Sequence, residues 1–169
     1  MKNNQGVVMR SATAEVHITI DASQIESFER IVPIELSSIF TGYGPLPRVV
    51  GTQDQTGNWD GAGQSRTVLL SDGSSAQEAL TDYQYPAYFA YTVNEFTGIL
   101  RFLAKEAHGQ WWFEQLPGTR TTSIRWKYEF ISRKRWLEPV VCLITQHLWK
   151  AYMGKALRLS KAQVEAAAA

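Results

Sequence analysis

Polar and apolar residues alternate along several parts of this sequence, which is the period of a strand that buries one face. In residues 13–20 the apolar positions that share a face are Ala14, Val16, Ile18 and Ile20. The clearest alternation lies in residues 119–132, where the even positions from 122 to 130 are mainly apolar and the odd positions are polar. Further strands are expected at 47–54, on both sides of a turn at 72–73, at 87–96 and at 100–116.

Two short helices are expected between the first two strands. Asp21 and Ser23 are both candidates for the N-cap of the first helix, because each is followed three residues later by Gln or Glu. Pro33 fits the first turn of a second helix within 31–40. The segment TGYGPLP at 41–47 contains four Gly or Pro residues and is expected to be a loop.

The last third of the chain has a helical period. Its apolar residues recur at steps of three, four and seven, at Leu137, Val141, Ile144, Leu148, Tyr152 and Leu159. This predicts one long amphipathic helix, after which the tail VEAAAA is expected to fray. A strand, two short helices, about six antiparallel strands and a long helix make an α+β architecture. We expect a single domain, 1–169, with an ordered core of about 11–162.

The turn at Asp72-Gly73 allows two registers. A three-residue loop with Gly73 left-handed collects the apolar residues on one face, and a one-residue slip would scatter them, so this register is favoured. It groups Arg66, Val68, Leu70, Ala76, Glu78 and Leu80. Arg66 and Glu78 are therefore expected to lie near each other on the inward face.

Two later turns set the faces of the aromatic strands. A turn at 97–98 would pair Tyr91 with Ala104, and keeping the inward faces consistent would then require a bulge near Gly109.

A turn at 117–118 would pair Leu116 with Thr119. Residue 111 would then lie opposite Ile124, on the face that also carries the side chain at 126. The inward aromatics expected from this pairing are Trp111, Phe113 and Trp126.

Composition narrows the classes of function. Lys and Arg number 17 against 16 Asp and Glu, a net charge of +1, so nothing indicates a nucleic-acid partner. No stretch reaches the roughly 18 consecutive apolar residues of a membrane span, and residues 1–10 lack the apolar core of a secretory signal. The single cysteine, Cys142, lies in an apolar run that indicates a buried thiol. We therefore expect a cytoplasmic protein without an integral membrane segment.

Several segments in order resemble the START-like or Bet v 1-like (SRPBCC) superfamily, in its bacterial polyketide cyclase/dehydrase and lipid-transport branch. The similar segments are TGYGPLPRVVG (41–51), GAGQSRTVLLSDG (61–73) with Glu78 after it, FAYTV (89–93), and GQWWF through GTRTTSIRWKYEF (109–130). The resemblance spans residues 13 to about 160. It implies a helix-grip fold, in which a curved sheet of about seven strands wraps a long C-terminal helix and leaves a cavity. Members bind lipids, sterols or polyketides, and some are cyclases, aromatases or hydrolases.

Within such a cavity the sequence proposes a set of ligand-binding residues: Arg66, Val68, Glu78, Phe89, Tyr91, Trp111, Phe113, Ile124, Trp126, Ile144, Leu148 and Tyr43. The pair Arg66 and Glu78 has three readings: an ion pair that fixes two strands, a polar anchor for a ligand, or a catalytic acid/base. For the aromatic side chains, plain core packing would bury the same faces, but the resemblance favours a cavity lining. His17, His108 and His147 lack metal-ligand spacing, so neither a metal nor a cofactor is expected.

Three functions follow from these features. The first is binding or transport of an apolar small molecule, a lipid, isoprenoid or polyketide-like compound, in the cavity. The alternative is a polyketide cyclase/aromatase or dehydratase-type enzyme that uses the same cavity. The third is a protein-interaction module with exposed aromatics such as Trp112 and Trp149. The expected state is a monomer or weak homodimer.

Overall fold

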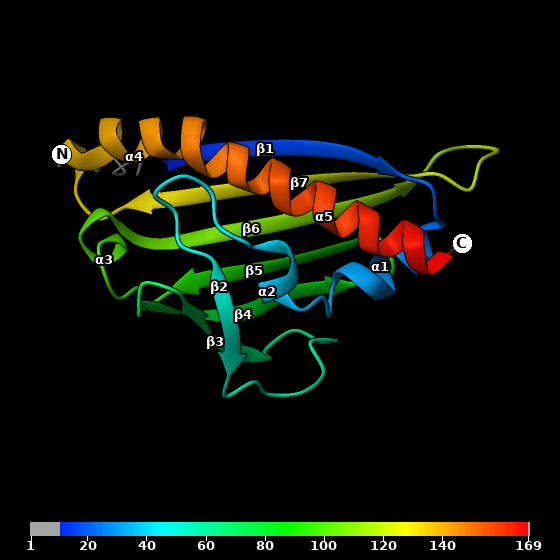
Figure 1. Cartoon of the computed structure of the whole chain (residues 1–169), viewed down its shortest axis with the longest axis horizontal. Coiled ribbons are helices and arrows are strands. Elements are labelled where there is room, and N and C mark those ends of the chain that lie inside the picture. Colours follow the sequence, from blue (N-terminus) through cyan, green and yellow to red (C-terminus); the bar gives the residue numbers. More distant parts are fainter. Residues whose placement is uncertain (1–10, 169) are drawn as a thin grey trace, which may run out of the picture.

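The computed structural model describes residues 11–168, which form one antiparallel sheet and a set of helices on one of its faces (Figure 1). The expectation about residues 1–10 falls outside this range. The sheet has seven strands in the order β1-β7-β6-β5-β4-β3-β2. Their bounds are β1 Ser11–Ile20, β2 Val49–Gln53, β3 Ser65–Leu70, β4 Ser75–Gln84, β5 Tyr88–Asn94, β6 Ala104–Gln115 and β7 Thr122–Ser132.

The helices cover the inner face of this sheet. Two short ones, α1 (Gln24–Ile31) and α2 (Leu36–Ile39), follow β1, and α3 (Leu100–Leu103) lies between β5 and β6. The C-terminal helix crosses the sheet from end to end (Figure 1). Its parts are the 3₁₀ turn η1 (Arg135–Leu137), α4 (Glu138–Ile144), the π-helical turn η2 (Thr145–Trp149) and α5 (Lys150–Ala168). The predicted α+β helix-grip fold is confirmed.

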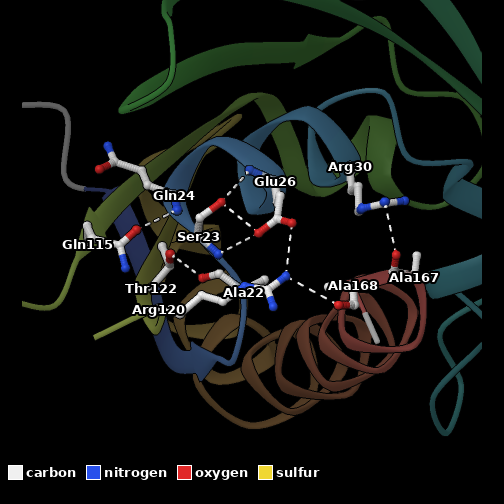
Figure 2. A network of polar contacts seen from close by, with 10 residues as sticks. All are labelled: Ala22, Ser23, Gln24, Glu26, Arg30, Gln115, Arg120, Thr122, Ala167 and Ala168. Carbon is white, nitrogen blue, oxygen red and sulfur yellow. Dashed lines mark hydrogen bonds and ion pairs between the residues drawn. The ribbon is translucent and has the colours of Figure 1, made fainter. Parts of the chain in front are cut away.

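The N-terminus of α1 is held by a polar network that also reaches the end of α5 (Figure 2). Ser23 is the N-cap, and with Glu26 it forms the capping box that the sequence offered as one alternative. The Glu26 carboxylate also accepts a hydrogen bond from Arg120 at 3.0 Å, and Arg120 donates to the carbonyl of Ala168 at 3.2 Å. This carbonyl belongs to the end of α5, which is helical through Ala168, so for residues 164–168 the prediction that the tail frays is wrong.

Pro33 and Cys142 also differ from their predicted places. Pro33 lies in the turn after α1, and α2 begins only at Leu36, so the proline ends one helix without starting the next. Cys142 is exposed, because α4 packs against the sheet through its neighbour Val141. The thiol is therefore not part of the core.

The β3–β4 hairpin has the predicted register. The amide of Leu70 donates to the carbonyl of Ser74 at 2.9 Å, which leaves a three-residue loop, and Gly73 is left-handed with φ of 80°. Arg66 faces Glu78 directly. Both side chains are buried.

The predicted β5–β6 register is wrong. Tyr91 pairs with Gly109, not with Ala104, because the connection is longer than a tight turn and contains α3. Phe96 and Leu100 of this connection turn inward and line the cavity, so their burial favours the longer excursion. With this pairing, the inward faces of β5 and β6 lie on the same side of the sheet, and the predicted bulge near Gly109 is not needed. The irregularity in β6 lies instead between Ala104 and Glu106.

The β6–β7 pairing is displaced by two residues from the prediction. The amide of Leu116 donates to the carbonyl of Thr121 at 2.9 Å, so the loop has four residues and Trp111 faces Trp126. A shift of two residues keeps every side chain on its face. Trp111, Phe113 and Trp126 are therefore buried on the inward side as predicted.

Candidate functional site

A cavity of about 160 Å³ lies between the inner face of the sheet and the helices. On the same scale one water molecule needs about 10–15 Å³, so the space exceeds what packing defects leave. Strands β3 to β7 form its floor, and α2, the loop 41–47 and the C-terminal helix form its roof. Leu46 and Pro47 of the loop are part of the lining, and Tyr152 holds this loop by donating to the carbonyl of Pro47 at 2.9 Å.

The floor carries a ladder of rings. Phe89, Trp111 and Trp126 occupy facing positions on β5, β6 and β7. Phe89 stacks on Trp111 with ring centroids 5.6 Å apart, and Trp111 stacks on Trp126 at 4.5 Å. In-register aromatic residues on neighbouring strands stabilise such a sheet through cross-strand contacts. They also give the cavity a flat apolar floor.

The roof contributes aromatic residues that the sequence did not assign to the site. Phe40 stacks on Trp149 with centroids 6.1 Å apart, and Trp149 lies 4.8 Å from Tyr128 of the floor. The π-helical turn η2 inserts an extra residue into the helical repeat and changes which side chains face the sheet. Trp149 therefore lines the cavity in place of Leu148.

A buried ion pair lies at the β3–β4 side of the cavity. The Nε of Arg66 donates to Oε2 of Glu78 at 2.7 Å, and the two residues are 5% and 6% exposed. The guanidinium also lies 3.9 Å above the ring of Trp59, which is a cation–π contact. Trp59 has a left-handed backbone with φ of 61°, which is uncommon for a bulky residue. Trp59 comes from the loop before β3, where no periodic pattern indicates such a contact.

Two phenols in the cavity wall are held neutral. Burial raises the pKa of Tyr91 well above its usual value, and the Glu78 carboxylate raises it further. Burial also raises the pKa of Tyr128, with smaller contributions from Tyr91 and Glu78. Both hydroxyls are therefore protonated at neutral pH and available to donate hydrogen bonds.

Two indole groups are poorly satisfied. The Nε1 atoms of Trp126 and Trp149 are buried, and no hydrogen bond of good geometry reaches them among the described residues. The Trp126 indole does lie near the Tyr91 hydroxyl, a contact that lowers the pKa of Tyr91 and partly offsets the effect of burial. Both residues line the cavity. A buried donor without an acceptor costs free energy, on the order of 1–3 kcal/mol, so each such group calls for an explanation. An acceptor inside the cavity would supply one.

Eight of the proposed ligand contacts lie in the cavity wall: Arg66, Val68, Glu78, Phe89, Tyr91, Trp111, Trp126 and Ile144. Phe113 and Ile124 are buried outside it, because Phe28 of α1 packs on Phe113 at 5.1 Å and fills that end of the sheet. Tyr43 is 39% exposed and stacks on the far side of Tyr152 at 6.4 Å.

The surface aromatics of the third hypothesis are covered by the chain itself. Trp149 belongs to the cavity wall, and Trp112 lies under the guanidinium of Arg125 at 3.7 Å and beside Tyr88 at 5.4 Å. Within residues 11–168 no group of His, Cys, Asp and Glu side chains is arranged to hold a metal ion. Over the same range, no helix is at once long and apolar enough to cross a membrane.

Neither a family model nor a curated protein matches this sequence. Solved structures do match. Ara h 8.0201 superposes with a TM-score of 0.66 at 17% identity, over 93% of this chain and 99% of its own. Norcoclaurine synthase from Thalictrum flavum, in complex with dopamine and hydroxybenzaldehyde, gives 0.63 at 14% identity, over 98% of this chain and 95% of its own. The protein XoxI from Bacillus cereus gives 0.60 at 14% identity, over 90% and 95%. These likenesses establish the helix-grip fold of Bet v 1-like proteins.

Proposed function

We propose that this protein binds an apolar small molecule, a lipid, isoprenoid or polyketide-like compound, in the cavity between the sheet and the C-terminal helix. The observation that carries the proposal is a cavity of about 160 Å³ walled mainly by aromatic and aliphatic side chains. Binding sites for small molecules are typically apolar pockets with a few placed polar groups. Burial of apolar ligand surface, at about 25 cal/mol per Å², would provide the driving force.

The polar groups of the wall define what the ligand carries. The indole N–H groups of Trp126 and Trp149 only donate, and the phenols of Tyr91 and Tyr128 are protonated donors. Donors around one cavity, of which the Trp149 indole has no acceptor among the described residues, favour a ligand with carbonyl or hydroxyl oxygens over a plain hydrocarbon. Because the charges of the buried Arg66–Glu78 pair compensate each other, the ligand is expected to be uncharged.

Native mass spectrometry of the purified protein, before and after organic extraction, tests this proposal. The expected result is a mass above that of the polypeptide that disappears on extraction. Ala76 lines the cavity, so Ala76→Phe, which places a ring in the space, should show no such mass. Failure of the extracted protein to retain any apolar compound from a mixture of lipids, isoprenoids and aromatic polyketides would overturn the proposal.

A second candidate is an enzyme of the polyketide cyclase/aromatase or dehydratase type. The supporting observation is that a protonated phenol, Tyr91, and a carboxylate, Glu78, lie close enough in one apolar cavity for the carboxylate to raise the pKa of the phenol. Glu78→Gln separates the two candidates. A carrier keeps its ligand after this change, whereas an enzyme keeps the ligand and loses turnover.

The proposal also covers the compartment and the oligomeric state of the protein. We infer a cytoplasmic monomer or weak homodimer, since the exposed Cys142 has no second cysteine in the chain and a reducing compartment keeps such a thiol free. Sedimentation velocity under reducing conditions tests the oligomeric state. A tight, higher-order assembly would contradict it.

A further inference from the structure

One end of the molecule exposes large apolar side chains from two separate segments. The residues are Ile99, Phe102, Trp136, Val140 and Leu143, and we call them the apolar end. Ile99 and Trp136 are each 72% exposed. Single exposed apolar residues are ordinary, but a group of five at one end of a molecule indicates an interaction surface.

The two segments belong to one surface. The amide of Arg133, just before η1, donates to the carbonyl of Leu103, the last residue of α3, at 2.9 Å. Ala104 and Ser132, the next residues inward, are paired in the sheet. Figure 1 shows α3 and α4 at the same end of the molecule, opposite α1 and the C-terminus.

The apolar end is surrounded by positive charge. Exposed basic side chains lie within the same two segments, at Arg101, Lys105, Arg133, Lys134 and Arg135. The only acidic residue of 99–105 and 133–143 is Glu138. The whole chain has a net charge of +1, so the rest of the protein is net acidic and the net positive charge is concentrated here. Arg101 also lies 4.5 Å above the ring of Phe102.

The apolar end adjoins the rim of the cavity. Leu100 of α3 and Ile144 of α4 line the cavity, while their chain neighbours Ile99 and Leu143 point outward. The same short helices therefore present one side to the cavity and the other to the surroundings.

We propose that the apolar end docks on a membrane surface that carries anionic lipids. Aromatic and aliphatic side chains such as Trp136 and Phe102 enter the headgroup region, and the basic residues contact lipid phosphates. An acidic protein partner would satisfy the charges but would not require five exposed apolar residues. This inference goes beyond the cavity's function and holds whether or not the cavity binds a ligand.

Flotation of the purified protein with vesicles tests it. Vesicles of phosphatidylglycerol and phosphatidylcholine should carry the protein up the gradient, and vesicles of phosphatidylcholine alone should not. Replacing Arg133, Lys134 and Arg135 together by Gln should lower the partition coefficient on the order of 100-fold, because each basic residue contributes about fivefold. Trp136→Ala should lower it about tenfold. Raising the salt concentration should release the wild-type protein.

Matched controls lie elsewhere on the surface. Ile25→Ala removes an exposed apolar residue of α1, and Arg158→Gln removes an exposed basic residue of α5. Both variants should bind as the wild type does. The proposal is overturned if Trp136→Ala binds undiminished, if neutral vesicles bind equally well, or if sedimentation shows a dimer that Trp136→Ala dissociates. In that last case the apolar end joins two copies of this chain.

Discussion

The phenol ring of Tyr91 occupies the space directly above Gly109, the residue that faces it on β6. A Cβ atom at position 109 would lie 2.1 Å from Cζ of Tyr91 and 2.5 Å from two further ring atoms. Glycine therefore lets the ring lie along the sheet instead of standing out from it. Since Tyr91 lines the cavity, this pairing helps to keep the space above the sheet open.

Gly109→Ala should therefore destabilise the fold and reduce the cavity. The methyl group displaces the Tyr91 ring, and overpacking of this kind costs about 1–3 kcal/mol. Chemical denaturation measures the loss, and native mass spectrometry should show less retained ligand. Gly51→Ala is the matched control, because a Cβ there has no atom within 4 Å. Equal stability of the two variants would contradict this reading of the Tyr91–Gly109 contact.

Arg66→Met should be more damaging than the loss of both charges. It leaves the buried Glu78 carboxylate without its partner, which typically costs about 3–5 kcal/mol. The double variant Arg66→Met/Glu78→Leu removes the orphaned charge, so we expect its unfolding free energy to return to within about 1 kcal/mol of the wild type. Urea denaturation of the three proteins measures both values. A cost below about 1 kcal/mol for the single variant would mean that water reaches the carboxylate.

Ala76→Phe should be tolerated, because the new ring enters empty space. The unfolding free energy is expected to stay within about 1 kcal/mol of the wild type. Ala12 is equally small and buried, but it lies outside the cavity wall. Ala12→Phe should therefore cost about 1–3 kcal/mol through overpacking. Thermal and urea unfolding compare the two variants, and equal destabilisation would indicate that position 76 faces no void.

The capping box predicts a dependence of stability on acid. Hydrogen bonds from the Ser23 hydroxyl and amide, with a smaller contribution from Arg120, lower the pKa of Glu26 from 4.5 to about 2. A group with a lowered folded-state pKa stabilises the protein above its unfolded-state pKa, and this contribution is lost as the pH falls from 4.5 toward 2. Urea denaturation at several pH values measures the unfolding free energy. As the pH falls from 4.5 toward 2, this free energy should decrease less steeply for Glu26→Gln than for the wild type. An identical pH dependence in the two proteins would contradict a stabilising role of the Glu26 carboxylate.

The alternation of polar and apolar residues predicted most of the strands. It also predicted the β3–β4 register, since only one pairing places the apolar residues on one face together with Arg66 and Glu78. The β5–β6 register could not be predicted, because α3 is a helix of four residues, too short for a hydrophobic period to indicate it. The apolar residues of this segment have an α-helical spacing that leaves Trp149 on the outer side. The π-helical turn η2 adds a residue to one turn and so rotates Trp149 toward the sheet, which the spacing does not reveal. Trp59 reaches the site from a loop that has no periodicity.

The central claim is that the rings of the floor and of the roof leave a space between them. The most direct measurement is a crystal structure of the ligand-free protein under xenon pressure, because xenon binds in apolar cavities. We expect a xenon peak between the floor and the roof, near Tyr91, Trp126 and Trp149. Electron density in which these rings mesh without a gap, and no xenon among them, would contradict it.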